Sequence, residues 1–164
     1  MKIKSVTANN RQRCFVIETR KGALTFPFAK LDRMPSRTNR VKEVYVDREL
    51  GKEAITYVLE SGKEDSVHVD DFLNYNKDPD YMRDLVLHKL TLKAGKLLKE
   101  SKLPKRELAR RLATSPAQTY RLLDPTNYRK SIDQMVRLLA CLDYTLDFVI
   151  EKDKRSAARP RNPC

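Results

Sequence analysis

The second half of the sequence contains two short helical segments separated by a tight turn, and this pair restricts the possible fold more than any other feature. The first helix is predicted over residues 105–113 and the second over residues 116–123. Ser115, with Gln118 three residues later, fits a capping box that starts the second helix. Helices this short bury little apolar surface alone, so they must cross closely and pack against further helices. Ala109 is small enough to allow that crossing, and a helix-turn-helix is therefore predicted.

Two further helices flank this pair. Asp78, which is followed by proline at the first helical position, predicts a long helix over residues 80–101. Ser131 starts a second capping box, and apolar residues at three- and four-residue spacing predict a helix from there to about Leu142. Residues 145–150 are predicted to form a last strand. The second half of the chain should therefore be a helical bundle with one strand at its end.

The first half has a different pattern, with short apolar or β-branched runs separated by turns. Strands are predicted at residues 2–6, 13–19, 24–28, 41–46, 54–59 and 66–69. The predicted fold class is α+β, with a small β-rich N-terminal module followed by an all-α helix-turn-helix domain with a C-terminal strand. The corresponding ranges are a β-rich module at 1–76, a helical domain at 77–151 and a basic disordered tail at 152–164.

Positive charge is concentrated in the second half. The sequence has 34 Lys and Arg residues against 22 Asp and Glu residues, a formal net charge of +12. Residues 1–76 hold 14 basic and 11 acidic side chains, whereas residues 77–164 hold 20 and 11. Twelve of these basic residues lie between positions 89 and 130, against three acidic ones. A density of this kind favours a polyanionic partner such as nucleic acid or an anionic membrane face.

Two stretches of the helical half resemble known families. The stretch that begins at Glu107 reads Glu-Leu-Ala-Arg-Arg-Leu-Ala-Thr-Ser and resembles the lambda-repressor-like, Cro-type helix-turn-helix family. Arg121-Leu-Leu-Asp-Pro, followed by Ser131-Ile-Asp-Gln-Met, resembles the C-terminal domain of HicB-type antitoxins. The resemblance covers about residues 85–150, and it departs from the family at Ala113, where glycine is usual. It implies sequence-specific binding of double-stranded DNA by a transcriptional repressor or an antitoxin-like autoregulator.

The same resemblance implies which residues would contact DNA. The second helix of the pair would lie in the major groove, with Thr119 and Leu122 turned inward. The residues then available to the bases are Ala117, Gln118, Tyr120 and Arg121. Arg121 is the main expected base reader, because a guanidinium can bond both O6 and N7 of guanine. Phosphate contacts are expected from Ser115, at the start of the helix, and from the cations Lys105, Arg106, Arg110, Arg129 and Lys130.

The sequence offers little support for an enzyme. The two histidines, His68 and His88, have no second ligand at a metal-binding spacing, so no metal site is expected. Asp70 and Asp71 are adjacent, and we expect them to form a solvated turn. The four glycines are too sparse for a loop that cradles phosphate, so no cofactor and no catalytic residue are expected.

The cysteines and the apolar runs bear on the compartment. The three cysteines, Cys14, Cys141 and Cys164, are scattered without a C-x-x-C pair, which fits a reducing compartment rather than a disulfide framework. No apolar signal core follows Met1, and no uncharged apolar run approaches the roughly 18 residues that span a bilayer. We therefore expect a cytoplasmic protein, and no membrane partner.

The expected partners follow from the helix-turn-helix. Such proteins usually place two recognition helices one DNA turn apart, which predicts a homodimer on double-stranded DNA. The N-terminal module is expected to bind a protein partner, such as a toxin, or to complete the dimer. Three alternatives remain open: a protein-interaction module with a purely structural helix pair, an RNA-binding protein, and a small hydrolase or nuclease that uses His68, Asp70 and Asp71.

Overall fold

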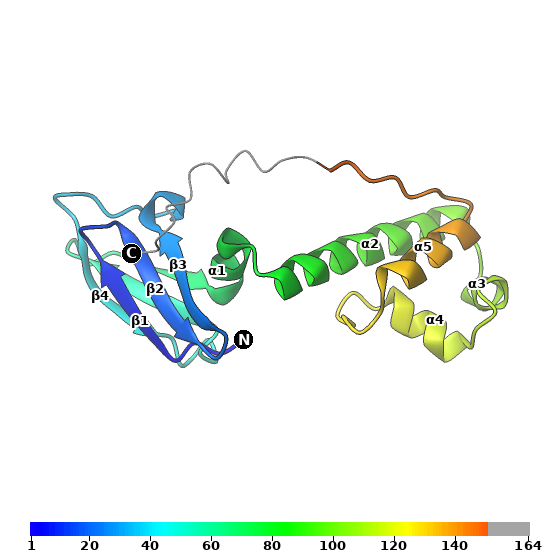
Figure 1. Ribbon diagram of the computed structural model, residues 1–164, viewed down its shortest axis with the longest axis horizontal. Coiled ribbons are helices and arrows are strands. Elements are labelled where there is room, and N and C mark those ends of the chain that lie inside the picture. The colour runs from blue at the N-terminus through cyan, green and yellow to red at the C-terminus, as the bar shows by residue number, and fades with distance from the viewer. Residues whose placement is uncertain (151–164) are drawn as a thin grey trace. The chain divides into compact units, whose positions relative to one another are not determined.

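The computed structural model describes residues 1–150 and divides them into two compact units, residues 1–81 and residues 82–150 (Figure 1). The first unit is built from strands with one α-helix, and the second from helices. Each unit has its own apolar core.

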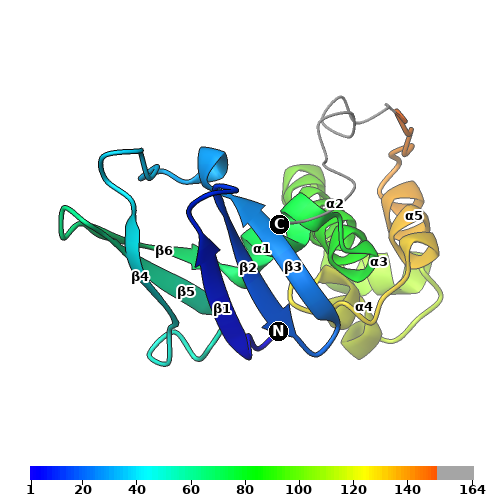
Figure 2. The ribbon, with the colours of Figure 1, turned by 60° about the vertical axis from the view of Figure 1, so that its left-hand side comes forward.

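The first unit contains two antiparallel sheets of three strands each (Figure 2). One sheet has the order β1-β2-β3, from β1 (Ser5–Asn9), β2 (Cys14–Thr19) and β3 (Gly22–Pro27). The other has the order β4-β5-β6, from β4 (Val41–Val46), β5 (Ala54–Leu59) and β6 (Glu64–His68). Strands β1 and β4 lie next to each other, and this brings the two sheets together. Within each sheet, neighbouring strands pair antiparallel, as expected when short turns connect them.

Aromatic rings fill the space between these strands. Phe15 on β2 contacts Phe28, in the short 3₁₀ helix η1 (Phe28–Lys30), with ring centroids 4.7 Å apart. It also contacts Tyr57 on β5, at 5.2 Å. Tyr57 is fully buried, and its hydroxyl donates a hydrogen bond to the carbonyl oxygen of Arg33 at 2.8 Å. The buried polar atom is therefore satisfied, and the rings can pack as an apolar core.

A helix closes the first unit. Helix α1 (Val69–Asn76) begins directly after β6 and packs against β3. Its N-cap is His68, whose Nδ1 accepts a hydrogen bond from the backbone N–H of Asp70 at 3.3 Å. At its other end, Nδ2 of Asn76 donates to the carbonyl oxygen of Thr25 on β3, at 2.8 Å. Phe72, fully buried, inserts into the same core as the strands.

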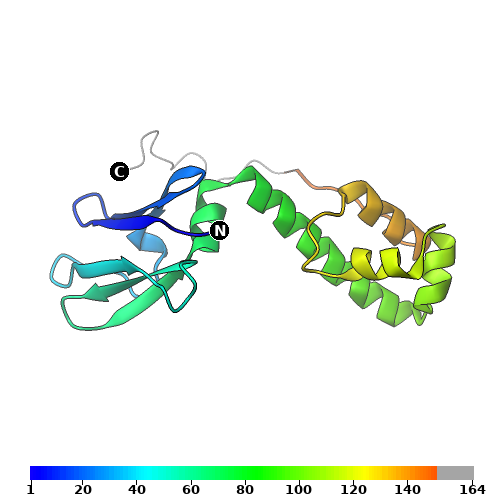
Figure 3. The same ribbon diagram turned by 90° about the horizontal axis from the view of Figure 1, so that it is seen from below.

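The second unit is a bundle of four helices. They are α2 (Pro79–Ser101), α3 (Lys105–Arg111), α4 (Pro116–Leu123) and α5 (Ile132–Cys141) (Figure 3). The predicted long helix is confirmed: the side chain of Asp78 accepts a hydrogen bond from the N–H of Tyr81 at 2.9 Å, and the helix runs without a break through Gly95. Leucines and Met135 form the core, and α3 contacts both α4 and α5. Among residues 1–150, no helix has both the length and the apolar character that crossing a membrane requires.

The predicted fold class is wrong at its C-terminal end. The N-terminal module is rich in strands, as predicted, and it also contains α1. The C-terminal strand predicted at residues 145–150 does not form, and Phe148, Val149 and Ile150 in that segment are exposed. A strand needs a ladder partner for its backbone N–H and C=O groups, and the surrounding unit consists of helices without a sheet edge. The predicted tail at 152–164 lies outside the residues that the structure describes.

Candidate nucleic-acid interface

The turn between α3 and α4 has the hydrogen bonds of a Schellman motif. Ala113 is in the left-handed region, with φ of 50°. Its N–H donates to the carbonyl oxygen of Arg110 at 3.1 Å, and the N–H of Thr114 donates to that of Ala109 at 3.0 Å. These bonds satisfy the last carbonyls of α3 and reverse the chain within a few residues. Ala109 is buried with 2% of its surface exposed, so it lies inside the crossing, as the small side chain predicted.

Helix α4 begins with the Ser115 half of the predicted capping box. The hydroxyl of Ser115 accepts a hydrogen bond from the N–H of Gln118 at 3.2 Å, and Pro116 occupies the first helical turn. The side chain of Thr119 donates to the carbonyl oxygen of Ser115, also at 3.2 Å. Because proline has no N–H and that of Gln118 is already bonded, the helix start offers a phosphate fewer donors than expected. The cap therefore fixes the position of α4 more than it binds a ligand.

Two faces of α4 differ sharply in exposure. Thr119 and Leu122 are buried, at 1% and 4% exposed, and they attach the helix to the bundle core. On the other side, Tyr120 is 56% exposed, Ala117 and Arg121 are exposed, and Gln118 is partly exposed. The expected inward and outward residues are thus placed as predicted. The structure brings the four expected base-reading residues onto one helix that presents them to solvent.

Several cations surround this face. Nζ of Lys105, at the start of α3, lies 4.7 Å from the centre of the Tyr120 ring, in a cation–π contact that links the two helices. Arg106 is exposed on the first turn of α3. Arg129 is exposed in the loop that follows α4. Lys105 and Arg106 lie at the start of α3, and Arg129 lies after the end of α4.

Arg110 is placed differently from the other expected phosphate contacts. Its Nε and Nη2 donate to the two carboxylate oxygens of Glu107, at 2.8 and 2.7 Å. This pairing lowers the pKa of Glu107 and raises the pKa of Arg110, in both cases mainly through the side-chain hydrogen bond between them. Arg110 is nevertheless on the surface, so a phosphate would compete with Glu107 for it. Its contribution to anion binding should be smaller than that of Lys105 or Arg106.

Lys130 does not lie where the sequence predicted. Its side chain is buried, with 5% of the residue exposed, and Nζ donates to the carbonyl oxygens of Leu122 at 3.0 Å and Asp124 at 2.6 Å. Burial lowers the pKa of Lys130, although the nearby carboxylate of Asp124 opposes the shift. The ammonium satisfies carbonyl oxygens at the end of α4. It is therefore a structural cap, and the prediction of a phosphate contact at this residue is corrected.

An open depression of about 520 Å³ lies beside α4. Gln118 and Arg121 line one side of it, and Asn127 and Arg129, from the loop after α4, line another. Nδ2 of Asn127 donates to the carbonyl oxygen of Arg121 at 3.0 Å, which holds the loop against the helix end. Asn127 was not among the expected site residues, because no local sequence pattern shows that this loop folds back. The loop positions Arg129 next to the exposed face of α4.

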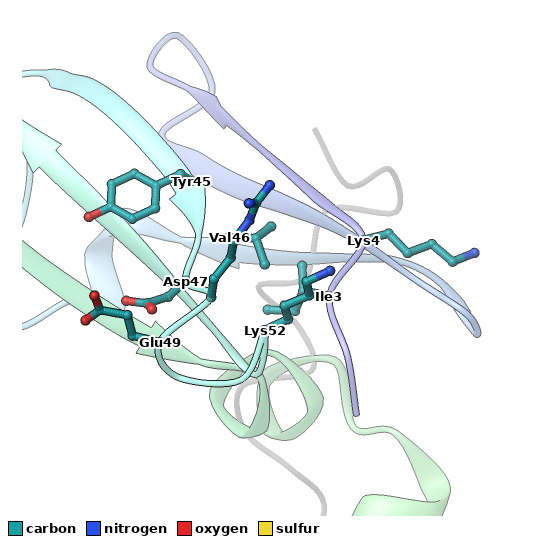
Figure 4. A pocket seen from close by; sticks show the side chains of 8 residues that line it. Ile3, Lys4, Tyr45, Val46, Asp47, Glu49 and Lys52 are labelled. Carbon is teal, nitrogen blue, oxygen red and sulfur yellow. The ribbon is translucent and has the colours of Figure 1, made fainter.

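A second cavity, of about 550 Å³, lies in the first unit near the start of the chain. Figure 4 shows the side chain of Lys4 pointing away from Asp47 and Glu49. The carboxylate of Asp47 accepts hydrogen bonds from the N–H of Leu50 at 3.0 Å and from Oγ1 of Thr56 at 2.8 Å. These bonds lower its pKa and show that it stabilises the turn between β4 and β5. The cavity has mixed charge, without the cationic excess seen around α4.

The three residues of the hydrolase alternative, His68, Asp70 and Asp71, lie at the N-terminus of α1. His68 is the N-cap of α1, and Asp70 and Asp71 are exposed in its first turn rather than in a free turn after a strand. Carboxylates at a helix N-terminus interact favourably with the helix dipole, which accounts for their position. His88 lies near the middle of α2, and its Nδ1 is 3.2 Å from the carbonyl oxygen of Pro125. Within the described residues, no group of three or more His, Cys, Asp or Glu side chains could hold a metal ion.

The resemblance predicted from the sequence, to lambda-repressor-like proteins and to HicB-type antitoxins, concerns residues of the second unit and stays a prediction. The burial of Thr119 and Leu122 and the turn at Ala113 are seen in the structure of this chain, without reference to any relative. Comparison with models of known families and with curated proteins gives no match for this chain.

Proposed function

We propose that the second unit binds double-stranded DNA, with α4 lying in the major groove, and that the protein regulates transcription as a repressor or an antitoxin-like autoregulator. The observation that carries the proposal is the division of α4 into a buried and an exposed face. Thr119 and Leu122 fix the helix to the bundle, while Tyr120 and Arg121 stay in solvent. A helix that is packed on one face and exposed on the other is suited to enter the major groove of DNA.

Base contacts in this proposal come from Arg121 and Gln118. An arginine can bond O6 and N7 of guanine, and a glutamine can bond N6 and N7 of adenine. Both side chains border the depression beside α4, which leaves room for a base edge. The methyl group of Ala117 is exposed one turn earlier and would contact a thymine methyl. The three residues together would read a short run of base pairs.

Phosphate contacts in this proposal come from Lys105, Arg106 and Arg129. All three are exposed cations that border the α3–α4 pair. Arg110 contributes less because Glu107 already neutralises it, and Lys130 does not take part because it is buried. The hydroxyl of Ser115 lies at the N-terminus of α4, where it can also reach a phosphate once α4 is in the groove. A regulator of this kind would act in the cytoplasm of a bacterial cell, where the chromosome lies.

The decisive experiment is selection of bound duplexes from a random pool, followed by affinity measurements at several salt concentrations. We expect the affinity for a selected site to fall steeply with salt, because Lys and Arg residues displace counterions from the phosphates. Arg121→Ala should cost about 1–3 kcal/mol on that site and relax discrimination at one position. Lys105→Ala should weaken binding to all sequences alike and reduce the salt slope by about one.

The matched control is Arg48→Ala, which removes the same charge from an exposed position of the first unit. It should leave affinity for the selected site unchanged. Equal losses for Arg121→Ala and Arg48→Ala would mean that net charge, and not α4, drives binding. No salt-dependent binding to any duplex would leave the helix pair with a purely structural role. Stronger binding to single-stranded RNA than to duplex DNA would favour the RNA-binding alternative instead.

A further inference from the structure

Helix α5 has two apolar faces, of which the second unit buries only one. Met135, Leu138 and Leu139 are buried in the bundle core. On the outer side, Ile132 and Val136 are 39% and 38% exposed. Ala140 is also exposed and continues the same row, since these three residues are four apart. We call Ile132, Val136 and Ala140 the outer stripe of α5.

Exposed apolar side chains continue past the end of α5. Phe148 is 60% exposed, Val149 is 83% exposed and Ile150 is 96% exposed. Large apolar residues gathered in this way usually mark an interaction surface. The sequence that follows, residues 151–164, contains no leucine, isoleucine, valine, methionine or aromatic residue. That segment has no large apolar side chains with which to cover the outer stripe.

The charged residues of α5 indicate which partner fits. Asp133 and Arg137 are the two charged residues of this helix, and they pair with each other at 3.2 Å. Asp133 is three residues before Val136, and Arg137 is one residue after it. On a helix, both positions lie on the same flank of the outer stripe. If an identical helix packs antiparallel against the stripe, with Val136 opposite its own copy, Asp133 of each helix comes beside Arg137 of the other. The flank is therefore complementary to itself.

We propose that the outer stripe of α5 is the interface with a second copy of this chain, packed antiparallel about a two-fold axis near Val136. The proposal rests on the proposed function in one respect, because a two-fold axis would supply two α4 helices for the two halves of a DNA site. It adds to that function the surface through which the dimer forms.

The test uses the full chain and two matched substitutions. Val136→Glu places a charge in the outer stripe, and Val86→Glu places the same charge at a valine of α2 with nearly the same exposure, 39% against 38%. Sedimentation equilibrium should give the wild type and Val86→Glu twice the chain mass of 19.1 kDa. For Val136→Glu we expect self-association weakened by roughly a hundredfold, as for a residue central to an interface. Circular dichroism should show all three proteins equally helical, since both valines are on the surface.

A charge exchange tests the antiparallel arrangement and does not depend on the behaviour of Val136→Glu. Asp133→Arg alone and Arg137→Asp alone should each weaken self-association, because each brings like charges together across the axis. The double exchange should restore it. A monomeric wild type, an unaffected Val136→Glu, equal losses for both valine variants, or no restoration in the double exchange would overturn the proposal.

DNA binding separates this proposal from the proposed function. If the wild type is a dimer that binds no duplex, the interface stands and the proposed function fails. If Val136→Glu keeps affinity for a half-site while losing affinity for the full site, both stand. If the wild type binds duplex as a monomer, the proposed function stands and the interface is wrong.

Discussion

The two units of this protein use their side chains in opposite ways. In the first unit, aromatic rings contact one another inside the core, as Phe15 does with Phe28 and Tyr57. Two of its cations pair with carboxylates, Lys2 with Glu53 and Lys21 with Asp80. The second unit has an aliphatic core, and it presents Arg106, Arg121 and Arg129 to solvent. The two units therefore differ in the chemistry of their cores, and the second places exposed cations around α4.

The comparison predicts that the core of each unit can be weakened separately, and this is the largest effect we expect. Phe15→Ala removes a fully buried ring that contacts both Phe28 and Tyr57, so it should cost the first unit about 3–5 kcal/mol. Leu108→Ala removes a fully buried side chain from the second unit and should cost about 2–5 kcal/mol there. Tyrosine fluorescence and far-UV circular dichroism during thermal unfolding would report the two transitions.

DNA affinity provides the control for this prediction. Phe15→Ala should keep the affinity of the wild type at a temperature where the second unit is folded, and Leu108→Ala should lose it. If Phe15→Ala lowers both transitions by the same amount, the units unfold as one, and the contrast between them does not extend to stability.

The second prediction compares two neighbouring cations of the second unit. Lys130→Met removes the buried donor that satisfies two carbonyl oxygens at the end of α4, so it should cost about 1–3 kcal/mol of stability. Arg129→Ala changes an exposed side chain and should alter stability by less than about 0.5 kcal/mol. Chemical denaturation measures both. Binding assays should show the reverse order, with Arg129→Ala weakening duplex binding under conditions where both variants are folded.

An Arg129→Ala variant as unstable as Lys130→Met would mean that the loop after α4 depends on both cations. A Lys130→Met variant with unchanged stability would show that its hydrogen bonds contribute no net free energy, as can happen when a buried charge is exchanged for an apolar side chain.

The helix ends of the second unit were predictable because their signals are local. The structure begins α2 at Pro79, starts α4 at Pro116 and ends it at Leu123, close to the predicted bounds. Ser115 and Ser131 accept hydrogen bonds from residues three positions later, which is information that a short stretch of sequence contains. Helix α1 has a similar local signal, because Asp70 and Asp71 precede the buried Phe72. The predicted strand nevertheless ran to Val69, where the structure begins the helix.

Features that depend on distant residues could not be predicted in the same way. The segment at 145–150 has the apolar residues of a strand, but strand formation requires a partner that the helical unit does not contain. Lys130 and Arg129 are adjacent basic residues, and only the folding of the loop onto α4 makes one buried and the other exposed. The outward face of α4 was predicted from the family resemblance, which implies that Thr119 and Leu122 are turned inward, and both are buried.

The smallest predicted effect concerns the turns. Glycines with positive φ, Gly22, Gly51 and Gly62, are all in the first unit, while the turn between α3 and α4 uses Ala113 at φ of 50°. An alanine in this left-handed region is strained by roughly 1 kcal/mol, which glycine relieves. Ala113→Gly should therefore raise the stability of the second unit by up to about 1 kcal/mol, as measured by chemical denaturation.

The control for that turn is Ala117→Gly, at an exposed position within α4, where glycine should lower stability by about 0.5–1 kcal/mol. Opposite signs for the two substitutions would show that the backbone conformation of Ala113, and not the loss of a methyl group, decides the result. If Ala113→Gly is also destabilising, the gain from relieved strain is smaller than the added freedom of the unfolded chain. The alanine would then stabilise this turn despite its conformation, because the hydrogen bonds to Ala109 and Arg110 already hold the reversal in place.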